Sequence, residues 1–166
     1  MVVYFNRSKK MNTIYNSIST EQKKILEIKQ IIPYIERKYA IKLYHLSPKR
    51  VFFVSHGNDF CLCSPSSKFY NTWQCYWVDI TLKQKLLLES YKHALIVFRL
   101  ENEKIFAIDW NNLKPFLNDQ AIQYNTHELE HWKLYIYQEH IRIGKSNQRI
   151  KGKIQSLLEW EKEYIL

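Results

Sequence analysis

Residues 127–131 read His-Glu-Leu-Glu-His, a match to the pattern H-E-x-x-H. On a helix, two histidines four residues apart share one face and can bind zinc, while the glutamate activates water. The residues after His131 alternate as a strand does, which would orient His127 and His131 differently, and no third ligand follows at close spacing. We therefore expect a polar turn that leads into a strand, with a zinc peptidase as the less favoured alternative.

Three acidic residues are candidates for a different metal site. Asp79, Glu103 and Asp109 would hold Mg²⁺ and orient a water molecule in a small nuclease of the restriction type. Such nucleases carry an E-x-K strand, whereas here Asn102 stands two residues before Lys104. The sequence keeps a metal-dependent nuclease as an alternative, and predicts no cofactor otherwise.

The cysteines predict buried thiols rather than a metal site. His56, Cys61, Cys63 and Cys75 are a possible Cys/His set, but structural zinc sites space their cysteine pairs as C-x₂₋₄-C. Two cysteines on one face of a strand are typical of small core residues. The odd cysteine count, with no apolar leader in residues 1–18, predicts free thiols and a cytoplasmic location. No apolar stretch is long enough to predict membrane insertion.

The remaining signal combines positive charge with aromatic rings. The chain has 25 Lys and Arg against 16 Asp and Glu, and this net charge of +9 favours nucleic acid as a partner before a membrane surface. Compositional bias is the alternative explanation. Basic side chains neutralise phosphates, and rings stack on exposed bases. The candidate contacts are Lys68, Tyr70, Trp73, Tyr76, Arg99, Arg142, Lys145 and Arg149.

Hydrophobic periodicity predicts the elements that carry these residues. Ser19 can cap a helix whose apolar positions run to Ile35, and Thr81 can cap a second helix over residues 82–91. Strands are expected at 51–54, 60–63, 74–80, 94–100 and 104–110, a short helix at 111–117, a strand or hairpin at 131–143, and a final helix at 149–164.

This order predicts an α+β fold: a mostly antiparallel sheet with an N-terminal helix, one or two inserted helices and a C-terminal helix. Residues 1–18 are expected to be a loose extension of a single domain over 19–166.

Five short segments between about residues 60 and 143 carry a recurring pattern. They cover residues 67–70, 76–78, 94–98, 105–108 and 131–136. This pattern resembles a poorly characterised bacterial domain that is found alone or beside restriction-type nuclease modules. The resemblance implies DNA recognition in a restriction or phage-defence setting, a strand position for His131, and no catalytic residues. The chain departs from that domain at Leu100–Glu103, which replaces a Gly-Cys-Gly turn, and at His131-Trp132, which reverses a Trp-His order.

Three hypotheses about function follow. The first is a nucleic-acid-binding module, with DNA as the preferred ligand, in a restriction or phage-defence system. The second is the metal-dependent nuclease. The third is a protein-interaction subunit or homo-oligomer that docks through Leu157, Leu158 and Trp160 of the final helix.

Overall fold

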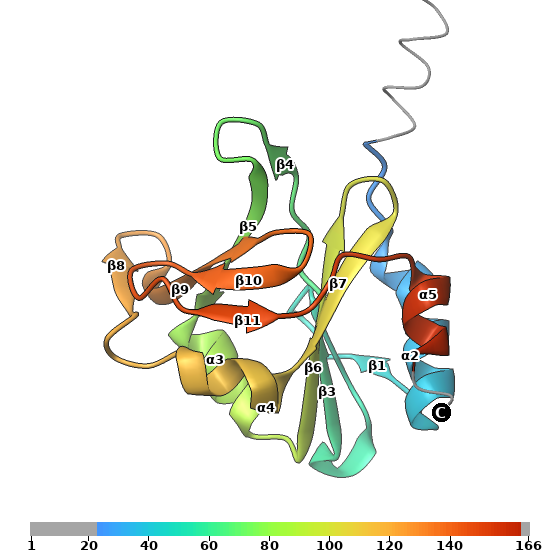
Figure 1. Cartoon of the computed structure of the whole chain (residues 1–166). Helices are drawn as coiled ribbons and strands as arrows, with labels where there is room; N and C mark the ends of the chain where they lie inside the picture. The colour runs from blue at the N-terminus through green and yellow to red at the C-terminus, as the bar shows by residue number, and fades with distance from the viewer. Residues whose placement is uncertain (1–22, 164–166) are drawn as a thin grey trace, which may run out of the picture.

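The computed structural model describes residues 23–163, which build three layers (Figure 1). Helices α2 (Ile28–Tyr39) and α5 (Leu157–Lys162) form the first layer. The second layer, the inner sheet, has the strand order β1-β2-β3-β6-β7; the third, the outer sheet, has the order β11-β10-β9-β5-β4, with β8 paired to β9. The strands are β1 (Tyr44–His45), β2 (Phe52–Val54), β3 (Phe60–Cys63), β4 (Phe69–Tyr70), β5 (Cys75–Thr81), β6 (His93–Leu100), β7 (Lys104–Asp109), β8 (Gln123–Asn125), β9 (Leu129–Ile136), β10 (His140–Ile143) and β11 (Arg149–Lys151).

The strand pairing confirms the predicted α+β class with mostly antiparallel strands. Every pair of neighbouring strands is antiparallel except β3 and β6. The predicted extension at residues 1–18 and the predicted cap at Ser19 lie outside the described residues. No helix within residues 23–163 is long and apolar enough to cross a membrane.

The helices begin where side chains satisfy the free backbone N–H groups of the first turn. In α3 (Leu82–Glu89), the Thr81 hydroxyl accepts from the Gln84 N–H and the Gln84 amide accepts in return from Thr81 N–H, a capping box. Helix α2 begins at Ile28, with Glu27 as its N-cap residue, and continues through Pro33. Two short helical turns, α4 (Trp110–Leu113) and a 3₁₀ turn at Lys114–Phe116, follow β7.

The inner sheet is buried on both faces. Leu62, Leu95 and Val97 face one cluster that includes residues of α2 and α5, while Cys61 and Ile96 face a second cluster shared with the outer sheet. A strand buried on both sides needs apolar residues at every position. This explains the continuous apolar run of β6.

The outer sheet packs on the core with one face only. In β9, Trp132, Leu134 and Ile136 belong to the second cluster, whereas the intervening Lys133 and Tyr135 belong to neither. This alternation is the pattern of a half-buried antiparallel strand. The outer sheet therefore presents a second face that the core does not use.

The predicted helix over residues 149–164 is wrong in its first half. Residues 149–151 form β11, which pairs with β10 and places Ile150 in the core opposite Ile141. The chain then bridges Ile105 of β7 at Gln155, and α5 begins only after Ser156. Isoleucines at 150 and 154 fit a helical period, but the free edge of β10 offers backbone partners that a local pattern does not reveal. As a result, Arg149 lies on the outer sheet.

Candidate nucleic-acid interface

The unused face of the outer sheet gathers aromatic and basic side chains, and we call it the open face. It consists of Tyr70, Trp77, Asp79, Lys133, Tyr135, Tyr137, His140, Arg142, Arg149 and Lys151. These residues alternate with core residues along β5, β9, β10 and β11.

Four of these residues form a row across four strands. Trp77 pairs with Tyr135, Tyr135 with Arg142, and Arg142 with Arg149. Neighbouring strands lie about 4.8 Å apart, so the row spans about 14 Å. Two aromatic rings occupy one end of the row and two guanidinium groups the other.

Cations lie directly over the rings of this row. Lys133 Nζ is 4.0 Å from the centroid of the Trp77 ring, and Arg142 Cζ is 4.2 Å from that of Tyr135. Tyr70 meets Trp77 edge-on, with 5.3 Å between ring centroids. Such cation–π contacts contribute roughly 0.5–2 kcal/mol each. They hold the rings in place and leave the cations close to any base that stacks there.

A second aromatic pair lies beside the row. The rings of Tyr137 and His140 stack with 4.7 Å between centroids and 17° between planes. Burial, and then the positive charges of Arg149 and Arg142, lower the pKa of His140 below its usual 6.5. His140 is therefore neutral at pH 7 and presents a heterocycle rather than a charge.

The cations on and around the open face have no acidic partner within 4.0 Å among residues 23–163, because the ion pairs of this part of the chain lie elsewhere. These cations are Lys68, Lys133, Arg142, Lys145, Arg149 and Lys151. At the outward positions of β5, β9, β10 and β11, Asp79 is the one acid. The open face is thus an uncompensated positive surface, which attracts polyanions.

Three of the predicted contact residues lie at the β4–β5 hairpin, which projects at the top of Figure 1. Lys68 and Tyr70 are exposed at β4, and Trp73 lies in the turn with 68% of its surface exposed. Tyr70 also contacts Trp77, so the hairpin extends the open face at one edge.

Tyr76 lies on the opposite side of β5 from the open face. Only 8% of its surface is exposed, and its ring packs edge-on against Phe69 at 5.2 Å. The prediction that Tyr76 stacks on a base is therefore wrong. Trp77 takes the outward position instead.

Arg99 does not reach this surface either. Its guanidinium donates to the backbone oxygens of Ser64, at 3.2 and 3.0 Å, and of Leu26, at 2.7 Å. Burial lowers its pKa, but an arginine stays charged at neutral pH. Arg99 links the inner sheet to the segment before α2, so its guanidinium is not free to contact a phosphate.

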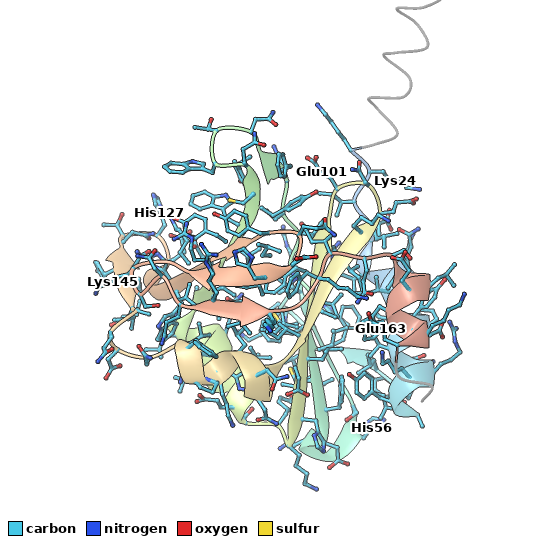
Figure 2. All side chains as sticks on the ribbon, in the orientation of Figure 1. Lys24, His56, Glu101, His127, Lys145 and Glu163 are labelled. Carbon is cyan, nitrogen blue, oxygen red and sulfur yellow. The ribbon has the colours of Figure 1, made fainter. Side chains whose placement is uncertain are left out.

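The two histidines of the H-E-x-x-H match lie in a turn and a strand rather than on a helix. His127 is exposed between β8 and β9, and His131 is buried in β9 with Nδ1 2.9 Å from the Leu129 oxygen. Figure 2 shows His127 on the same side of the molecule as Lys145, whose Nζ donates to the Ile122 oxygen. No group of three metal-ligating side chains occurs within residues 23–163.

The three carboxylates proposed for a nuclease lie apart. Asp79 is on the outer sheet, whereas Glu103 and Asp109 flank opposite ends of β7 in the inner sheet. Glu103 pairs with Lys24 at 3.1 Å, and Asp109 accepts from the Asn111 N–H at the start of α4. The structure does not bring these residues into one site.

The cysteines are buried free thiols, as predicted. Burial raises the pKa of Cys61 to about 12 and also raises the pKa values of Cys63 and Cys75. All three thiols are therefore protonated at neutral pH and unsuited to nucleophilic chemistry.

The C-terminal helix uses most of its apolar surface within the chain. Leu157 and Trp160 pack in the cluster shared with α2, and Lys38 Nζ lies 3.8 Å from the centroid of the Trp160 ring. Of the three residues proposed to dock a partner, only Leu158 is exposed, with 57% of its surface accessible.

Within residues 23–163, Asp79 lacks hydrogen-bond partners for part of its carboxyl group. Its Oδ1 is buried without a hydrogen-bond partner among the described residues, and burial raises the pKa of the carboxyl group. The folded chain thus holds this proton more tightly than the unfolded chain, so ionisation of Asp79 costs stability at neutral pH.

Asp79→Asn is expected to stabilise the protein at pH 7 by about 1 kcal/mol, since the carboxyl group is only partly buried. The gain should vanish as the pH falls below the usual carboxyl value of 3.8, where both states are protonated. Urea unfolding at both pH values measures this difference. The control is Asp119→Asn, because the exposed carboxylate of Asp119 makes no ion pair within the described part of the chain. A gain that persists in acid would contradict the explanation.

Sequence reasoning did not select six residues of the open face: Trp77, Lys133, Tyr135, Tyr137, His140 and Lys151. The alternation of β9 already separates Lys133 and Tyr135 from its apolar positions. The sequence does not reveal the strand pairing that brings the outward residues of β9 beside Trp77 and Arg142.

We compared the chain with protein-family models, with curated proteins and with solved structures, and none of these comparisons finds a match.

Proposed function

We propose that this protein binds single-stranded DNA on the open face of its outer sheet. The observation that carries the proposal is the row Trp77–Tyr135–Arg142–Arg149, in which rings and cations follow one another across the strands. Bases stack on aromatic side chains at about 1–3 kcal/mol each, while arginines neutralise the adjacent phosphates.

The shape of this surface favours a single strand over a duplex. Rings on a sheet contact the flat faces of bases, which a duplex hides within its own stack. The unpaired cations supply the electrostatic attraction for the backbone. The resemblance over residues 60–143 extends this proposal to a restriction or phage-defence setting, in which the protein would act beside a nuclease.

A titration of labelled single-stranded and duplex DNA of the same sequence tests the proposal. We expect tighter binding to the single strand, a steep loss of affinity with added salt, and intact DNA with or without Mg²⁺. Fluorescence anisotropy measures the binding, and a gel reports the products.

Each other outcome points to a different function. Equal or tighter binding to the duplex would contradict stacking on the open face. Cleavage that requires Mg²⁺ would favour a nuclease, and an absence of binding would leave the positive charge as compositional bias.

A further inference from the structure

We propose that the open face recognises guanine in the single strand, with Asp79 and Lys133 as the residues that read the base. This inference rests on the proposed function and names the base it selects. Asp79 and Lys133 lie directly opposite each other in β5 and β9, next to the Trp77–Tyr135 pair.

Asp79 is unexpected on a surface that binds phosphates. A carboxylate among cations repels the DNA backbone, and buried polar atoms normally have a hydrogen-bond partner. Asp79 Oδ1 has none among the described residues, and Lys133, its cross-strand neighbour, turns its ammonium to the Trp77 ring instead. Asp79 therefore retains acceptor capacity that the protein does not use, and its side chain must rotate outward for a base to reach the buried Oδ1.

Guanine matches the hydrogen-bonding groups of this pair. Its Watson–Crick edge presents the O6 acceptor followed by two donors, the N1–H and the N2 amine. Lys133 supplies donors, and the Asp79 carboxylate supplies two acceptor oxygens. Adenine, cytosine and thymine each present at most one donor beside an acceptor on this edge, so they satisfy fewer of these groups.

The geometry allows one base to stack and be read at once. Trp77 and Asp79 are two residues apart on the same face of β5, about 6–7 Å along the strand. A base that stacks on Trp77 displaces the Lys133 ammonium from the ring and leaves it at the edge of the base. Beyond Lys133, a depression of about 620 Å³ lined in part by Tyr124, Glu130 and Lys145 offers space for the next nucleotide.

Thymidine oligonucleotides with one central guanine, adenine, cytosine or inosine test this assignment by fluorescence anisotropy. We expect guanine to bind about tenfold tighter than adenine, cytosine or thymine, within the range known for two good hydrogen bonds to a base. Inosine, which lacks the N2 amine, should fall between. Asp79→Asn should lose the guanine preference, because its amide offers only one acceptor, while Asp59→Asn on the β2–β3 turn should keep it.

The outcomes separate this inference from the proposed function. Equal affinity of the wild-type protein for all these oligonucleotides would contradict guanine recognition by Asp79 and Lys133. It would leave the proposal of single-strand binding intact. A guanine preference that survives in folded Asp79→Asn would also contradict recognition by this pair. Failure to bind any of the oligonucleotides would overturn both proposals together.

Discussion

Reversing the charges of Arg142 and Arg149 to glutamate should weaken binding to single-stranded DNA by about 100-fold or more at moderate ionic strength. Each reversal removes a proposed phosphate contact and adds a repulsion, and about 1.4 kcal/mol lost per site is a factor of ten. The dependence of affinity on salt should also flatten, by about 1.4 in the logarithmic slope for two phosphates on a single strand. Anisotropy titrations at several salt concentrations measure both effects.

The matched control is Arg50→Glu with Lys114→Glu. Both residues are exposed, and neither side chain makes an ion pair or hydrogen bond within the described part of the chain. This control lowers the net charge by the same amount as the first pair. If it weakens binding equally, the attraction comes from the charge of the whole molecule and not from the open face.

Replacing Arg99 by methionine should destabilise the fold by about 2–4 kcal/mol, because it leaves the backbone oxygens of Ser64 and Leu26 without their donors. Methionine keeps most of the apolar stem, so the loss reports the hydrogen bonds rather than a cavity. Urea unfolding measures the free energy, and the DNA affinity of the folded fraction should not change.

Arg142→Met is the counterpart on the open face. Its guanidinium donates to Asn147 Oδ1 near the surface, so its loss should cost about 1 kcal/mol of stability or less. It should nevertheless weaken DNA binding by about tenfold. The substitution removes both the proposed phosphate contact and the cation–π contact between Arg142 and the Tyr135 ring. If folded Arg99→Met bound DNA as weakly as Arg142→Met, that result would indicate that Arg99 contacts the DNA.

The local sequence determined the elements whose signals are short-range. Thr81 forms the predicted cap of α3, and the strands predicted at 94–100 and 104–110 are β6 and β7. The apolar run of β6 and the alternation of β9 both match their burial. Caps, turns and periodicity depend on residues a few positions apart, so they can be read directly from the chain.

Tertiary structure alone decided which side of each element became the open face. Tyr76 and Trp77 are equally aromatic neighbours, and only the packing of β5 on the inner sheet buries the first and exposes the second. Arg99 is basic like Arg142, but its place beside Ser64 and Leu26 makes it structural.

The row of the open face joins residues from 77 to 149 through strand pairing. Residues 149–151 joined that sheet because β10 had a free edge, against a local pattern that also fits a helix. A strand's partners and its buried face depend on contacts distant in sequence, so composition could indicate a basic, aromatic protein but not where those groups would meet.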